Sequence, residues 1–162
     1  MTGDWRLATG SIRCTAEGRL VLGDGVAYAS RHLRPDVLID MATLTGAQGT
    51  VSGGKHAAVL SSCEELERQA VSAGRSSGDL VFPLLYCPEL LLKEFASEVA
   101  DLKNSVKDRS NATCSAAGHF VEAHIDPDFK GAWLHVDMAY PVHQGERATG
   151  WGCAFLHDLL HI

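Results

Sequence analysis

Residues 36–43, with the sequence DVLIDMAT, form a short apolar run that is typical of a buried strand. Two further runs share this character, HAAVLSS at 56–62 and AWLHVDMA at 132–139. Strands that are apolar on both faces need helices on both sides of their sheet, as in parallel and mixed α/β sheets. These three segments therefore predict the central strands of an α/β fold.

The stretches around these strands carry helical patterns. Helices are predicted over residues 18–33, 88–98, 113–125 and 149–160. Another follows the run at 56–62, where Ser62 and Glu65 have the spacing of a capping box. Gly74 has the character of that helix's end.

Two further segments are predicted to be extended. Residues 79–86 contain Pro83, which favours an edge strand or a bulge, and residues 99–104 are short and extended. The alternation of strands and helices predicts a mixed, largely parallel sheet with helices on both faces. In such folds functional residues gather in the loops at the carboxyl ends of the strands.

The composition is that of one ordinary globular domain. The chain has 162 residues, of which 46% are apolar and 21% charged, and this excludes intrinsic disorder. Its formal charge of -6 makes nucleic acid and anionic membrane unexpected partners. We expect no membrane span and no secretory signal, since the apolar runs are short and the start is not basic. Five cysteines without a C-x-x-C pair favour reduced thiols in a cytoplasmic protein.

Two histidine motifs have a chemical and a structural explanation. His119 and Glu122 are three residues apart on a predicted helix, close enough to share a metal, but one exposed helix face explains them equally well. His135 and Asp137 lie on the same face of a predicted strand. That carboxylate could orient the imidazole, although a structural hydrogen bond in the core is the favoured interpretation.

The segment CTAEGRLVLGDGVAYA, residues 14–29, carries the strongest functional signal. Glu17 and Arg19 flank Gly18 at the start of a predicted helix. A carboxylate at the amino end of a helix is stabilised by the helix dipole, so capping alone accounts for Glu17. An acid and a guanidinium two residues apart could equally bind a cation and an anion.

This segment resembles the signature of the leucyl aminopeptidase (cytosol aminopeptidase) family, whose usual form is Asn-Thr-Asp-Ala-Glu-Gly-Arg. Similar motifs follow in the family's order: DMATLTGA (40–47), CSAAGHF (114–120), WLHVDMA (133–139) and ATGWG (148–152). The stretches GDLVFPLLYCPEL and VADLKNSVKDRSN look most like its aminopeptidase-like branch. The resemblance covers residue 14 to about residue 160.

The resemblance implies the release of amino-terminal residues from peptides by a water that two divalent ions, zinc, manganese or magnesium, activate. It implies that Glu17 is a metal ligand and that Arg19 is catalytic, holding a bicarbonate that relays the proton of the water. The matching positions in the pocket for a leucine-like side chain are Thr43, Gly46, Ala139 and Val142. Family members assemble as hexamers through this domain, so the resemblance also implies a homo-oligomer.

Two departures from the family pattern limit these expectations. Thr15 stands where the family has a metal-binding Asp, and a neutral hydroxyl is a poor ligand for a divalent ion. The family also places two lysines and two more metal-binding aspartates upstream, whereas this chain has no lysine before Lys55. We therefore expect a divergent segment at 1–13 and part of the catalytic domain at 14–162. The expected function is an impaired metal-dependent aminopeptidase; the alternative is a catalytically silent isoform that associates with full-length subunits.

Overall fold

The computed structural model describes residues 17–162, so the predicted segment 1–13 and the departure at Thr15 lie outside the described residues. The helices are α1 (Glu17–Tyr28), η1 (a π-helix, Ala29–Leu33), α2 (Gln48–Ser52), α3 (Glu64–Ser77), α4 (Pro88–Leu91), η2 (a 3₁₀-helix, Leu92–Phe95), α5 (Thr113–Glu122) and α6 (Cys153–Leu160). The strands are β1 (Val37–Ala42), β2 (Ala57–Leu60), β3 (Val81–Pro83), β4 (Ala132–Asp137), β5 (His143–Gln144) and β6 (Arg147–Ala148).

The central sheet has four strands in the order β1-β4-β2-β3. β1 pairs with β4 and β2 with β3 in parallel, whereas β2 and β4 are antiparallel. A separate two-stranded hairpin joins β5 to β6. The prediction of a mixed, largely parallel sheet is therefore confirmed.

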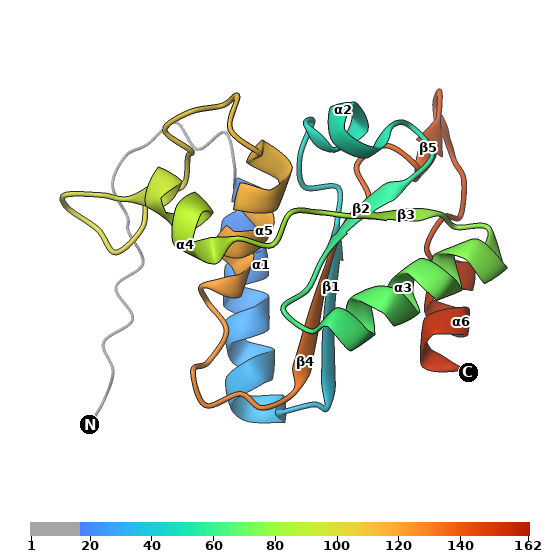
Figure 1. Ribbon diagram of the computed structural model, residues 1–162, viewed down its shortest axis with the longest axis horizontal. Coiled ribbons are helices and arrows are strands. Elements are labelled where there is room, and N and C mark those ends of the chain that lie inside the picture. Colours follow the sequence, from blue (N-terminus) through green and yellow to red (C-terminus); the bar gives the residue numbers. More distant parts are fainter. Residues whose placement is uncertain (1–16) are drawn as a thin grey trace.

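Helices cover both faces of this sheet (Figure 1). On one face α3 packs against α6, and on the other α1 packs against α5. Strand β2 shows why both covers are needed, because Ala57 and Val59 belong to the core cluster with α3 and α6, and Ala58 and Leu60 to the cluster with α1 and α5. Since all four side chains are buried, the apolar pattern of this strand is explained.

The boundaries of α3 differ from the prediction at both ends. Its N-cap is Cys63, with no side-chain cap, so the predicted capping box does not form. Instead the Ser61 hydroxyl accepts a hydrogen bond from the Cys63 amide at 3.1 Å. The helix continues past Gly74 and ends at Ser77, and its C-cap is Gly78, whose φ of 81° is the left-handed conformation that glycine adopts without strain. Gly74 is buried, and a Cβ there would lie 3.0 Å from the Asp79 carbonyl oxygen, so close packing is the reason for this glycine.

Two other predicted elements are shorter than expected. Of residues 79–86 only β3 pairs, and it lies at the sheet edge, where Pro83 needs no partner on its open side. The expected extended segment 99–104 contains no strand and belongs to a long connection before α5. No helix within residues 17–162 has the length and apolar character needed to cross a membrane.

Candidate functional site

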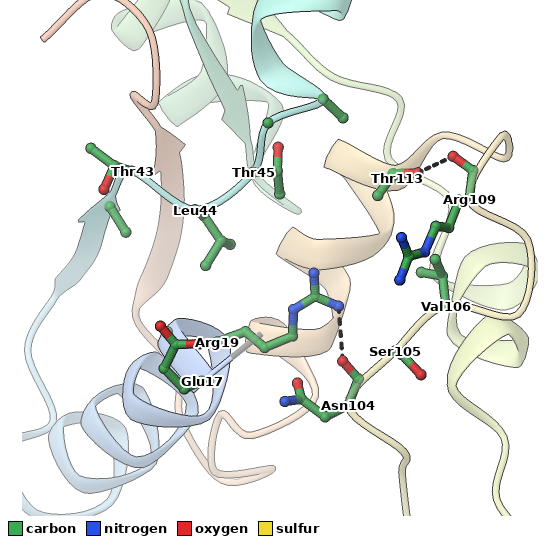
Figure 2. Close-up of a pocket in the computed structure, with 14 residues that line it drawn as sticks. Glu17, Arg19, Thr43, Leu44, Thr45, Asn104, Ser105, Val106, Arg109 and Thr113 are labelled. Atoms are coloured by element: carbon green, nitrogen blue, oxygen red, sulfur yellow. Dashed lines mark hydrogen bonds between the residues drawn. The ribbon is translucent and has the colours of Figure 1, made fainter. Parts of the chain in front are cut away.

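A cavity of about 580 Å³ opens beside the carboxyl end of β1, between the start of α1 and the connection before α5. Figure 2 shows the side chains that converge on it from these three segments. Four of the predicted site residues line this cavity: Glu17, Arg19, Thr43 and Gly46. Its position matches the expectation that function gathers beyond the carboxyl ends of strands.

Arg19 is fixed firmly at the cavity although it carries a charge. Only 7% of the residue is exposed, and its guanidinium carbon lies 5.7 Å from the ring centre of Phe95 and 5.8 Å from that of Phe120. Such ring faces attract a cation. Its Nη1 also donates a hydrogen bond to the Asn104 carbonyl oxygen at 3.4 Å (Figure 2). The cavity therefore presents a preorganised positive group, which suits an oxyanion.

Glu17 is the first residue of α1, and it is exposed. The helix dipole stabilises a carboxylate at this position, so its place needs no ligand to explain it. In Figure 2 its carboxylate and the Arg19 guanidinium extend in different directions from the first turn of the helix. Both groups border the cavity, and one can contact a cation while the other contacts an anion.

The loop after β1 forms one wall of the cavity. It carries Thr43 and Gly46, and its backbone is held by a buried carboxylate on β4, since the amides of Leu44 and Thr45 donate to Asp137 Oδ1 at 3.0 and 3.3 Å. The conformation of this loop is therefore fixed by hydrogen bonds from its backbone amides to a side chain, and not by pairing with a strand.

The remaining two predicted substrate-binding residues lie elsewhere. Ala139 and Val142 follow β4 and are half-buried, but neither lines this cavity. The Ala139 amide donates to Asp137 Oδ1 at 3.3 Å, and the Val142 carbonyl accepts from the Thr149 amide at 3.0 Å. The structure thus brings four of the six predicted positions to one cavity and leaves these two beside it.

Residues 104–113 supply a wall that the motif analysis did not assign. Asn104, Arg109 and Thr113 line the cavity from this connection and from the start of α5. Figure 2 shows the Arg109 guanidinium turned toward the same space as that of Arg19. These residues form a long loop without a regular hydrophobic pattern, and tertiary packing places the loop beside the cavity. The sequence pattern therefore gave no sign that they belong to the site.

His135 is oriented by a carboxylate other than the one the sequence suggested. Its Nδ1 lies 2.6 Å from Asp40 Oδ1 on β1, the residue that faces it in the parallel pairing, while Asp137 binds the loop after β1. The other Asp40 oxygen accepts from Trp133 Nε1 at 2.7 Å. Burial opposes protonation of His135, but the Asp40 carboxylate, with a smaller contribution from Asp137, outweighs it, so the pKa of His135 is raised. This buried network joins β1 to β4, in line with the structural interpretation.

The His119–Glu122 motif is also structural, but its predicted exposure was wrong. His119 is completely buried, and its Nδ1 lies 2.8 Å from Glu122 Oε2. Its Nε2 accepts a hydrogen bond from the Cys87 amide at 3.0 Å, so both ring nitrogens are engaged. Glu122 also accepts from the Tyr86 hydroxyl at 2.7 Å, and burial together with this carboxylate raises the pKa of Tyr86 to about 12. The motif fastens α5 to the segment before α4.

The donor atoms of residues 17–162 do not gather into a metal site. Among these residues no three His, Cys, Asp or Glu side chains lie close enough together to hold an ion. Among the described residues that line the cavity, Glu17 is the one acidic side chain, and the others are two arginines, hydroxyls, an amide and aliphatic groups. Divalent ions need several oxygen or nitrogen ligands in a defined geometry, so the described residues do not form a metal centre by themselves.

Comparison with known proteins identifies relatives over most of the chain. The family profile described as "Cytosol aminopeptidase family, catalytic domain" matches residues 12–157. A curated human relative, "Probable aminopeptidase NPEPL1", is 60% identical over 141 residues, which are 87% of this chain and 27% of the relative. Leucine aminopeptidase 1 of Caenorhabditis elegans is 46% identical over 146 residues, which are 90% of this chain and 30% of the relative.

Solved structures agree with these relatives. The apo structure of leucyl aminopeptidase from Trypanosoma cruzi superposes with a TM-score of 0.87 at 54% identity, covering 90% of this chain and 29% of that one. The chain therefore spans a little under a third of the length of the relatives that it matches. On the strength of the profile match, the sequence identity and the shared fold, the chain belongs to the cytosol aminopeptidase family.

Proposed function

We propose that this chain supplies one part of a metal-dependent aminopeptidase site, and that its own residues do not complete that site. The observation that carries the proposal is the convergence of Glu17 and Arg19 with Thr43 and Gly46 at a single cavity. The family match adds the reaction class, which is the release of amino-terminal residues from peptides.

In this proposal Arg19 is the group that binds an oxyanion. Its guanidinium is held by two aromatic rings and a backbone carbonyl, so binding an anion requires little rearrangement of this side chain. A bicarbonate is the ligand that the family resemblance suggests. Arg109 borders the same space and adds a second positive charge there.

Thr43 and Gly46 form the proposed wall for the amino-terminal side chain of the peptide. Small side chains leave room in the wall, and Leu44, Ala42 and Ala47 add aliphatic surface around them. A concave and largely aliphatic wall favours a leucine-like residue over a charged one.

Manganese or zinc is the ion proposed for the complete site, with Glu17 as one ligand. Because the described residues offer a single carboxylate at the cavity, the other ligands must come from outside residues 17–162. We therefore propose that the 162-residue chain has little or no peptidase activity alone.

Hydrolysis of leucine p-nitroanilide tests this proposal. The purified chain is assayed with added manganese or zinc beside a full-length family member as a positive control. We expect no turnover by the chain where the control is active. Turnover that disappears in Glu17→Gln, but survives in the matched surface variant Glu64→Gln, would show that the chain forms a working site unaided.

The alternative function is a silent subunit that associates with full-length relatives. Exposed apolar residues along α1, η1 and the open edge of β1 favour it: Val21 is 70% exposed, Leu33 66% and Val37 40%. Large apolar side chains that are this exposed favour burial in an interface. Co-expression with a tagged full-length relative tests it: we expect the chain to copurify, and the double variant Val21→Lys, Leu33→Lys to be lost. Equal recovery of both forms would contradict an interface at this face.

A further inference from the structure

Asp137, the last residue of β4, is fully buried and accepts hydrogen bonds from the loop after β1, from the residues after β4 and from Cys114 on α5. On one side its donors are the amides of Leu44 and Thr45, at 3.0 and 3.3 Å, and the Thr45 hydroxyl at 2.7 Å. On the other side is the amide of Ala139 at 3.3 Å, and the Cys114 thiol donates at 3.3 Å. A carboxylate has about four lone-pair sites for these five donors, so at least two donors share a site, and a neutral side chain offers still fewer.

The topology explains why this carboxylate reaches both the loop after β1 and the residues after β4. Asp137 pairs in register with Ala42, the last residue of β1, so the two strands end at the same edge of the sheet. Beyond that edge the Met138 amide still donates to the Ala42 carbonyl at 2.8 Å, whereas the amides of Leu44, Thr45 and Ala139 donate to Asp137. A buried amide without a partner is costly, and Asp137 satisfies three of them.

Gln48 makes a second connection between the loop after β1 and the residues after β4. Its fully buried side chain accepts from the Tyr140 amide at 2.8 Å, and it donates to the His56 carbonyl at 2.6 Å. The Gln48 amide in turn donates to the Thr45 hydroxyl at 3.1 Å, so this residue depends on the group that Asp137 holds. The hydrogen bonds of Asp137 and Gln48 therefore form one network that meets at Thr45.

We propose that Asp137 is a positioning residue for substrate binding. It holds the loop of Thr43 and Gly46 in place relative to Ala139, which lies beside the cavity. That Thr43 and Gly46 form the wall for the amino-terminal side chain rests on the proposed function. Asp137 does not line the cavity, and it acts through Thr45 and the backbone amides.

Amide hydrogen exchange on the full 162-residue chain tests the positioning role without any need for activity. In Asp137→Ala we expect the amides of Leu44, Thr45 and Ala139 to exchange at least about tenfold faster, because each loses an acceptor with carboxylate character. The amides of β2 and β4 inside the sheet serve as internal references. Equal acceleration of loop and sheet amides, or no change at the loop, would overturn the proposal.

Thr45→Val and Thr45→Ser provide the milder pair in case Asp137→Ala does not fold. Valine keeps the volume and removes the hydroxyl, so we expect the Gln48 and Leu44 amides to exchange about threefold faster or more. Serine keeps the hydroxyl, so exchange should stay within twofold of the unaltered chain, roughly the scatter of neutral changes. Identical exchange in the valine and serine variants would contradict the network.

Titration with leucinamide, followed by amide chemical shifts, tests the functional part. We expect shifts at Thr43, Gly46 and Ala139 in the unaltered chain and in Thr45→Ser, and weaker binding by about threefold or more in Thr45→Val. Binding that is equal in both variants would overturn the role in substrate binding. An absence of any shift in the unaltered chain would instead count against the proposed function, and the exchange data would still decide whether Asp137 positions the loop.

Discussion

Asp40→Asn removes the carboxylate that links β1 to β4 through His135 and Trp133. Trp133 Nε1 can only donate, so it claims the single carbonyl oxygen of the new amide. The amide nitrogen then faces His135 Nδ1, which can accept only when the proton is on Nε2. Nε2 is already buried without a hydrogen-bond partner within residues 17–162 in the unaltered chain. The variant therefore loses the hydrogen bond between the imidazole and a carboxylate, and it buries a proton on Nε2 that has no acceptor. We expect this change to lower the free energy of unfolding by about 1–3 kcal/mol at pH 8.

The cost depends on pH in a defined direction. In the unaltered chain burial disfavours the charged ring, but Asp40 outweighs it and raises the pKa of His135 above its ordinary value. A raised pKa in the folded state gives stability that is complete below about pH 6.5 and is lost as the pH rises through the folded value. In Asp40→Asn only the charge of Asp137, the weakest of these influences, still opposes burial, so the pKa of His135 is lowered and protonation at acid pH favours unfolding. We therefore expect a loss of about 3–5 kcal/mol at pH 5, as for a buried ion pair that loses one partner.

Urea unfolding at pH 5 and pH 8, at one low protein concentration, measures both values. Asp36→Asn is the matched control, since Asp36 is exposed just before the same strand and should change stability by less than about 0.5 kcal/mol. A loss in Asp40→Asn that is the same at both pH values would refute the role of His135 protonation. A loss no larger than that of the control would refute the network itself.

Three further predictions follow from packing and from the family pattern. Gly118→Ala should destabilise by about 1–3 kcal/mol in urea, because its Cβ would lie 2.6 Å from Leu60 Cδ2, whereas Gly25→Ala in open space should not destabilise. Thr15→Asp alone should give no hydrolysis of leucine anilide, since parts of a catalytic unit act together; a clear gain over background would contradict this. The chain should self-associate in light scattering through exposed apolar residues such as Val21, and a monomer that survives concentration would count against that.

The layered architecture was predictable because its cause is local. A strand that is apolar at every position, such as β2, indicates that both faces of its sheet are covered. The structure agrees, since alternate residues of β2 belong to the core clusters on opposite faces of the sheet. The family motifs likewise located Glu17, Arg19, Thr43 and Gly46, which the fold gathers at one cavity. In both cases the information lies within a few consecutive residues.

Partners across the sheet were not predictable from spacing. His135 and Asp137 share a strand face, but they do not bind each other. The register of β1 against β4 places Asp40 opposite His135, whereas Asp137 accepts hydrogen bonds from the loop after β1. The burial of His119 and the arrival of Arg109 at the cavity have the same origin. Contacts between residues far apart in sequence depend on register and loop path, which periodicity does not encode.

Calorimetric titration of the purified chain with manganese or zinc tests whether these residues hold metal ions unaided. We propose that they contribute a carboxylate and an arginine to an aminopeptidase site but do not hold its metals by themselves. The cavity offers one carboxylate among residues 17–162, so we predict no tight binding and no difference between the unaltered chain and Glu17→Gln. Two ions bound per chain in the micromolar range, with one or both lost in Glu17→Gln, would contradict the account.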